Sequence, residues 1–554
     1  MLGIYKIFRF TGNAMQQPPT RRSFLKASGA VTLGAWSGTG PRKAAANRLS
    51  LNEPATLAKL RAKAIHRKRR LIFNNDGGDI EHASTVDALM AQRNRPVLGT
   101  QVDSIFYGTG NTTMLTCLSQ VAEVYSEFGG PWADNIAALK SAGHDTLAAT
   151  VDFCQENQLE IFWTHRMNDV HCSSPDAEWL LCRWKREHPQ YLMGTREDRD
   201  RSIGLKSPRY WWSALDYEQP EVLDYICRIQ QDICSRYGID GVECDYFRTP
   251  LLFRPNLDYQ PVTAAQVEIL TNFQRRLRKI HLQEGTRRGR PILTAARVPG
   301  TPEACRHVGI DIQRWLEEGL LDLLTVTGGY LPFTEPVDQI IRMAHQAKVP
   351  VYPSINTPLI LRRPKQQLEA LRGAASNMFH AGADGILLFN HFRPDFPTTD
   401  ASQLMDIGSP ETLAGKNKWF VIDSGRWEKG CYSQGISQSH VLPQAIPADG
   451  APLVVQLPIG DDLAAADRNG SLASVLLQIQ LSDTTVAKSI EIRLNGQELT
   501  AVENATEPQW LEYHPRATNL RWGLNKISIR AKKGLPGKTI LANLQQAQLP
   551  VVYK

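Results

Sequence analysis

The sequence lacks several patterns that would place it in a familiar functional class. It has neither a G-x-G-x-x-G nor a G-x-x-x-x-G-K-[ST] motif, which argues against a nucleotide-binding sheet with a phosphate loop. Its formal net charge is +7, but its Lys and Arg residues form no dense run, so no nucleic-acid partner is expected. No apolar stretch is long enough to predict a membrane span.

The nine cysteines also lack a pattern. No C-x-x-C pair or zinc-ligand spacing occurs, and their number is odd. Several stand in apolar segments, where a free cysteine behaves as a small hydrophobic residue. We therefore predict no disulfide framework, and we expect no metal or other cofactor.

The N-terminal segment carries an export pattern. Residues 20–26 read TRRSFLK and are followed by a short apolar stretch and by three alanines at 44–46. Paired arginines before such a stretch match the twin-arginine export signal. We predict that residues 1–46 are this signal and that the protein is exported to the periplasm or the cell exterior. The alternative is a basic tail with no targeting function.

Residues 69–395 alternate short apolar runs with longer amphipathic segments. Segment 220–237, for example, repeats its apolar residues at helical spacing. Alternating strands and helices build a parallel sheet, and this length suits a barrel of eight such units. We therefore predict an α/β fold, a (β/α)₈ TIM barrel over residues 47–407, rather than a doubly wound sheet. Eight runs have strand character, starting near residues 70, 102, 159, 238, 291, 320, 349 and 382.

The pattern of apolar and polar residues changes after residue 407. Helical periodicity fades, and runs such as KSIEIRLNGQEL alternate apolar and polar residues. Asn495-Gly496 is a strong hairpin-turn signal between two of these runs. We predict a C-terminal all-β sandwich domain over residues 408–554.

The fourth apolar run, GIDGVECDYF, carries acids where a buried strand is expected. Side chains alternate along a strand, so Glu243 and Asp245 face the same way, opposite to Val242 and Cys244. Carboxylates in an apolar setting are costly unless a ligand meets them. We predict that Asp245 and Glu243 are catalytic, as an acid paired with a nucleophile or base. The alternative is a buried ion network with interior arginines.

Other polar residues follow strand ends, where barrels of this kind carry their active sites. Asp76, Asp169 and His165 are candidates for a second catalytic acid or base. Turn formation or helix capping explains the two aspartates equally well. His171 and His391 are further candidates, either as bases or as metal ligands, although packing is the commoner role of a single histidine.

Four arginines also follow strand ends, and we predict that they bind substrate: Arg166, Arg248, Arg297 and Arg393. Guanidinium groups around one mouth favour a substrate that bears carboxylate or sulfate. The alternative is that they pair with the nearby carboxylates. Asn390 and His391 are predicted to bind substrate as well. Trp163 and Trp212 are predicted to stack on sugar rings.

The segment 212–247 resembles a family of bacterial glycosyl-hydrolase-like barrels, of the glycosyl hydrolase-like 10 type. The likeness rests on Pro-Glu-Val at 220–222, Arg-Tyr at 236–237, Asp-Gly-Val at 240–242 and Asp-Tyr at 245–246. It implies a barrel that hydrolyses glycosidic bonds with Asp245 in the site. Two departures are Glu243-Cys244 before that aspartate and the HRMNDVH segment at 165–171. The seventh run, PSINTP, also lacks the Glu that many retaining barrel glycosidases place there.

Together these features predict an exported glycoside hydrolase that acts on a polysaccharide or oligosaccharide, with an anionic polymer favoured by the arginines. A first alternative is a glycan-binding barrel that has lost its chemistry. A second is a metal-dependent hydrolase that uses Asp76, His165, Asp245 and His391 as ligands.

Overall fold

The structure of the protein is a computed structural model. It describes residues 53–125, 132–327, 336–356, 367–392, 401–423, 430–432, 434–435, 442–502, 510–532 and 539–554. The predicted export signal and Arg393 lie outside these residues. Within the described part of the chain, no helix has the length and apolarity needed to cross a membrane.

Eight parallel strands close into a barrel in the order β1-β10-β9-β8-β7-β6-β5-β2. Each strand coincides with one of the predicted apolar runs, so the predicted (β/α)₈ barrel is confirmed. The strands are β1 (Leu71–Asn75), β2 (Val102–Gly108), β5 (Glu160–Arg166), β6 (Gly241–Asp245), β7 (Leu293–Val298), β8 (Leu323–Val326), β9 (Val351–Asn356) and β10 (Ile386–Phe389).

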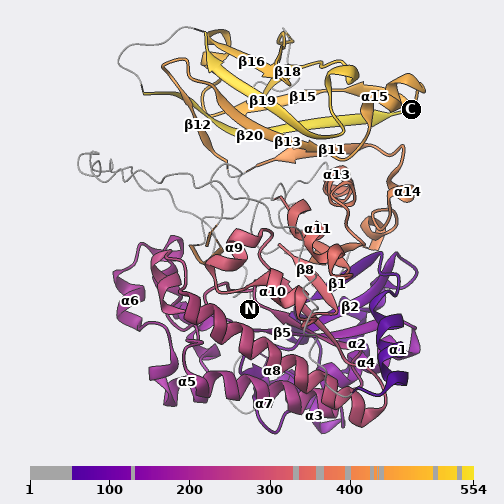
Figure 1. Ribbon diagram of the computed structural model, residues 1–554, viewed down its shortest axis with the longest axis vertical. Coiled ribbons are helices and arrows are strands. Elements are labelled where there is room, and N and C mark those ends of the chain that lie inside the picture. The colour runs from indigo at the N-terminus through magenta and orange to yellow at the C-terminus, as the bar shows by residue number, and fades with distance from the viewer. Residues whose placement is uncertain are drawn as a thin grey trace, which may run out of the picture. The chain divides into compact units, whose positions relative to one another are not determined.

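Helices surround the strands, and the two longest of the described helices, α7 and α8, pack against each other (Figure 1). Pro220 at the first turn of α7 and a Thr263–Gln266 capping box on α8 fix where these helices begin. The helices of this region are α1 (Ala55–Ile65), α2 (Val86–Gln92), α3 (Ala133–Ser141), α4 (Thr146–Glu156), α5 (Arg183–Glu187), α6 (Arg196–Arg201), α7 (Pro220–Arg236), α8 (Ala264–Arg288), α9 (Pro302–His307), α10 (Ile312–Glu317), α11 (Asp338–Gln346), α13 (Gln367–His380) and α14 (Pro410–Leu413).

Two buried clusters show which strand positions face inward. The inner cluster contains one or two residues from seven of the eight strands, and it includes Ile72 of β1, Phe162 of β5 and Phe389 of β10. The larger outer cluster contains the alternate positions, such as Phe73 and Trp163, packed against the helices. Because side chains alternate along a strand, this parity assigns every strand residue to the interior or to the helical layer.

The amino end of the barrel is closed by buried ion pairs. Arg69 binds both oxygens of Glu160 at 2.6 and 2.7 Å, and Arg61 of α1 binds Asp322 at 3.0 Å. Each of these buried charges is thus compensated by a partner of opposite sign, as buried charges require.

The C-terminal region forms two antiparallel sheets that share one hydrophobic core, as predicted. Asn495 and Gly496 both have positive φ, at 53° and 89°, as the predicted hairpin turn between β16 and β17 requires. One sheet contains β11 (Lys418–Ile422), β12 (Gln444–Pro447), β14 (Leu472–Val475), β15 (Leu477–Leu481), β18 (Trp510–Tyr513) and β20 (Ile540–Tyr553). The other contains β13 (Leu453–Ile459), β16 (Ile490–Leu494), β17 (Gln497–Glu498) and β19 (Gly523–Ala531), and α15 (Leu463–Arg468) follows β13.

The last strand, β20, pairs with four others, although the sequence did not mark it as a strand. Its segment, ILANLQQAQLPVVY, mixes glutamines and a proline with apolar residues, and its buried positions do not alternate strictly. Different parts of β20 pair with different strands, which breaks the simple period of two.

Candidate functional site

Glu243 points into the interior of the barrel. Its carboxylate accepts hydrogen bonds from Thr164 Oγ1 of β5 at 2.9 Å and from Thr325 Oγ1 of β8 at 2.7 Å. Since β5 and β8 lie on either side of β6 and β7, both contacts run through the interior. Burial, followed by the negative charge of Asp245, raises the pKa of Glu243 to about 7. Glu243 therefore keeps its proton to a higher pH than a glutamate usually does.

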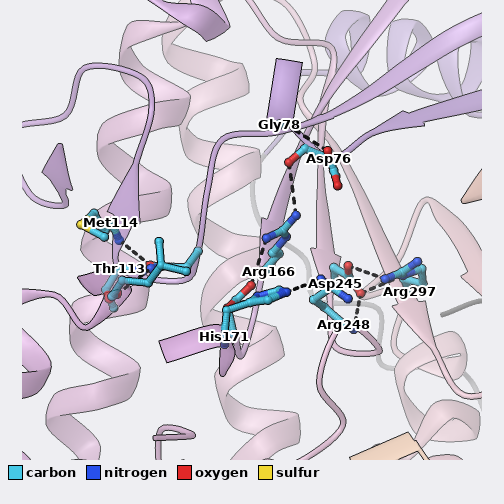
Figure 2. A network of polar contacts seen from close by, with 12 residues as sticks. Asp76, Gly78, Thr113, Met114, Arg166, His171, Asp245, Arg248 and Arg297 are labelled. Carbon is cyan, nitrogen blue, oxygen red and sulfur yellow. Dashed lines mark hydrogen bonds and ion pairs between the residues drawn. The ribbon is translucent and has the colours of Figure 1, made fainter. Parts of the chain in front are cut away.

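Asp245 lies two residues further along β6 and faces Arg297 of β7 (Figure 2). Arg297 Nε and Nη2 donate to the two carboxylate oxygens at 2.8 and 2.7 Å. The backbone N–H groups of Phe247 and Arg248 also donate to Oδ1. Asp245 is thus held in a buried ion pair, which is the alternative that the sequence left open. The Arg297 guanidinium also lies 4.4 Å from the ring centre of Phe389.

Asp169 and His171 form a hydrogen-bonded pair in the loop after β5. His171 Nδ1 lies 2.7 Å from Asp169 Oδ1, and Arg248 Nη2 lies 2.8 Å from His171 Nε2. These partners favour a neutral imidazole that donates from Nδ1 and accepts at Nε2. The Asp169 side chain is 2 % exposed and that of His171 is 46 % exposed. The pair therefore combines a buried carboxylate with an accessible imidazole.

The electrostatics of this pair separate its two pKa values. Burial acts to raise the pKa of Asp169, but His171, Arg166 and Arg248 outweigh it and hold the pKa well below its usual range. Partial loss of hydration is the main cause of a lowered pKa for His171, and Arg248 adds to it against the opposing effect of Asp169. An ionised aspartate thus orients a neutral histidine, which is an arrangement suited to a base.

Arg166 connects this pair to the end of β1. Its Nη1 donates to Asp169 Oδ2 at 3.0 Å, and its Nη2 donates to the backbone oxygen of Asp76 at 3.2 Å (Figure 2). The Asp76 carboxylate itself binds Arg93 at 2.6 Å. Burial of Asp76 opposes its ionisation, but Arg93 and Arg166 together lower its pKa to about 2. The predicted residues Asp76, Asp169, Arg166, Arg248 and Arg297 thus belong to the polar contacts of one end of the barrel.

Two of the predicted site residues face the helical layer. Trp163 and His165 stand at the positions of β5 that alternate with Thr164 and Arg166, and their rings stack at 4.6 Å. His165 contacts the backbone oxygen of Thr112 and the amide of Gln230, and burial lowers its pKa to about 4. The structure therefore does not bring the predicted catalytic His165 or the predicted sugar-stacking Trp163 into the inward-facing cluster.

The remaining predicted residues are placed as follows. Trp212 is packed in the outer core, where its Nε1 donates to the oxygen of Ser173 at 3.3 Å. Asn390 and His391 directly follow β10 and are buried, and Asn390 has a positive φ of 51°. Arg393 lies outside the described residues. No group of three His, Cys, Asp or Glu side chains that could hold a metal ion occurs in the described part of the chain.

Three residues that bind the predicted acids were not predicted from the sequence: Thr164, Thr325 and Arg93. The two threonines occupy inward positions of β5 and β8, so the period of two could have indicated them once Glu243 was taken to face inward. Arg93 stands next to Asn94 just after α2, and no local pattern marks it as a partner of Asp76.

No model of a known protein family matches this chain. No curated protein sequence matches it either. Among solved structures, it is similar to the glycoside hydrolase domain of PgaB (BpsB) from Bordetella bronchiseptica, with 12% identity, 62% of this chain and 99% of that chain covered, and a TM-score of 0.37. It is also similar to alpha-L-fucosidase isoenzyme 2 from Paenibacillus thiaminolyticus, with 15% identity, coverage of 63% and 49%, and a TM-score of 0.39. Chitinase ChiA74 from Bacillus thuringiensis shows 8% identity, coverage of 86% and 100%, and a TM-score of 0.35.

Proposed function

We propose that this protein is an exported glycoside hydrolase that cleaves a polysaccharide or oligosaccharide at the carboxyl end of its barrel. The observation that carries the proposal is the Asp169–His171 pair, in which a buried carboxylate orients an accessible imidazole beside Arg248. A base held in this way can activate a water molecule for attack on a glycosidic carbon. A substrate that draws Arg248 away from His171 would free the lone pair on His171 Nε2, which could then accept the proton of the attacking water.

Glu243 supports the same proposal. Glu243, whose pKa is raised to about 7, lies two residues before the ion-paired Asp245 on the same strand. Two carboxyl groups in such different environments are suited to acid–base chemistry. The proposed roles are His171 as base, Asp169 as its positioning residue, and Glu243 with Asp245 as the inward acidic pair. The resemblance of segment 212–247 to glycosyl-hydrolase-like barrels points to the same reaction.

The arginines at this end of the barrel bear on which substrate charge the site would favour. Arg166 and Arg297 are each paired with a carboxylate, so neither adds an uncompensated positive charge. Arg248 lies beside the proposed base, where it donates to His171 Nε2, and its guanidinium could also donate to a uronate or sulfate group of the substrate. Arg248 therefore supports the proposal that the substrate is an anionic polymer.

One observation favours a second function, a glycan-binding barrel without catalysis. Both carboxylate oxygens of Asp245 accept hydrogen bonds from Arg297, an arrangement that suits a structural residue better than a catalytic one. The test is product release from neutral, uronate-containing and sulfated polysaccharides by the purified protein and by His171→Gln. Release of products that is lost in the variant supports the hydrolase. Binding without release by the wild type rejects it in favour of the binding protein.

A further inference from the structure

Among the described residues at the carboxyl end of the barrel, Asn74, Asn356 and Arg297 are buried and carry polar atoms that have no hydrogen-bond partner. These atoms are Asn74 Oδ1, both polar atoms of the Asn356 amide, and Arg297 Nη1. The three residues are 5 %, 2 % and 1 % exposed. Buried polar groups are almost always paired, because an unpaired one keeps the full cost of losing water. A cluster of such groups therefore calls for a partner from outside the chain.

The register of the strands brings these atoms together. Asn74 of β1 and Asn356 of β9 are the neighbours of Phe389 on the two sides of β10. Residues paired across parallel strands point to the same face, and Phe389 belongs to the inner cluster. The Arg297 guanidinium reaches the same place from β7, since it lies 4.4 Å from the Phe389 ring centre. The three side chains thus lie next to one aromatic ring inside the barrel.

The chemistry of this cluster selects a neutral polyhydroxylated ligand. An asparagine amide donates and accepts without charge, and a sugar hydroxyl does both in return. The charge of Arg297 is already met by Asp245, so Nη1 offers a hydrogen bond without an uncompensated charge. An acidic group placed at Nη1 would also approach the Asp245 carboxylate and be repelled by it.

We propose that Asn74, Asn356 and Arg297 Nη1 form a subsite that binds one neutral sugar ring through its hydroxyl groups, next to Phe389. This inference rests on the proposed function in placing the sugar at the reacting end of the barrel, and it deepens that function by naming the ring bound there. Any acidic substituents of the polymer then lie toward Arg248, outside this subsite.

The experiment measures binding and stability, not activity. Isothermal titration of the purified protein with glucose, galactose, N-acetylglucosamine, fucose and glucuronate would be repeated for Asn74→Leu and Asn356→Leu. We expect at least one neutral sugar to bind more tightly than glucuronate, and its affinity to fall at least tenfold in each variant. The melting temperature should stay the same or rise, because leucine removes unpaired buried groups and fills a similar volume.

A matched control is Asn377→Leu. Asn377 of α13 also has a buried and unpaired Oδ1, but its amide donates to Pro458 of the C-terminal region. This change should leave sugar binding unaltered. The proposal is overturned if no sugar binds, if glucuronate binds best, or if the Asn74 and Asn356 variants keep full affinity. A clear fall in the melting temperature of both variants would also overturn it, because internal water would then be their structural partner. Sugar binding with no product release from any polymer rejects the hydrolase and leaves this subsite standing.

Discussion

Asp245 and Arg297 form a two-point ion pair inside the barrel, with contacts of 2.8 and 2.7 Å between adjacent residues of β6 and β7. Their side chains are only 3 % and 1 % exposed, so water does little to screen either charge. Removal of one partner from such a pair leaves a buried charge without compensation. The pair therefore links a predicted catalytic acid to the stability of the fold.

Arg297→Met should lower the free energy of unfolding by about 3–5 kcal/mol. In the double variant with Asp245→Asn the loss should be smaller than the sum of the two single losses, because the second change removes the stranded charge. Urea unfolding of the four proteins measures this coupling. The matched control is Arg209→Met, which breaks an exposed pair with Asp258 of the same 2.7 Å length and should change stability by no more than about 1 kcal/mol. Equal losses in Arg297→Met and Arg209→Met would contradict the prediction.

Glu243 should make the protein less stable as the pH rises through the neutral range. Its pKa is about 7 in the folded state against an ordinary value of 4.5, so the folded state holds the proton that the unfolded state releases. Its contribution is full below pH 4.5 and is lost as the pH rises to about 7. The free energy of unfolding of the wild type, compared with Glu243→Gln, should fall by at most roughly 3 kcal/mol over that window. Parallel curves for the two proteins in urea titrations would disprove the assignment.

His171→Gln should reduce kcat by about 100-fold to 10,000-fold if the imidazole is the base. The effect on stability should be small, because the side chain is nearly half exposed. His345→Gln is a matched control, since His345 contacts Asp384 at 2.9 Å with 42 % of its side chain exposed and lies on α11 before the amino end of β9. Activity of His345→Gln should equal that of the wild type. A similar kcat for His171→Gln and His345→Gln would exclude this base.

Asp169→Asn should lower kcat and also move the pH profile. The pKa of His171 lies below its usual value, and the negative charge of Asp169 is what opposes a further fall. Without that charge, the acid limb of kcat/KM should shift to lower pH. The profile of the variant on a soluble glycan measures this shift. An unshifted limb with reduced kcat would show that Asp169 acts only through structure.

The nine cysteines should be unreactive in the native protein and fully reactive after unfolding. All nine are buried and free of disulfides, as the sequence predicted. An aromatic disulfide reagent should therefore release no thiol signal from the folded protein and nine equivalents in denaturant without a reductant. Fewer than nine equivalents would reveal a disulfide that contradicts this arrangement.

The sequence by itself determined the eight barrel strands and the change to a β domain. The short apolar runs between amphipathic helices, and the alternation of apolar and polar residues after residue 407, are local patterns. Such patterns can be recognised without knowing which segments pack together. It also determined that Glu243 and Asp245 share one face of β6. The same alternation separates Trp163 and His165 from Arg166 on β5, but the residues alone do not say which set faces inward.

Only the closed barrel decided that question, because inside and outside exist only after β1 pairs with β10 and β2 with β5. Closure placed His165 among the helices and put Thr325 of β8 within reach of Glu243. It also chose the partner of each charge: Arg297 for Asp245, and His171 for Arg248 from 77 positions away. These pairings depend on the strand register and on how the loops approach one another. Both are set by contacts between residues that are far apart in the chain, so no local segment encodes them.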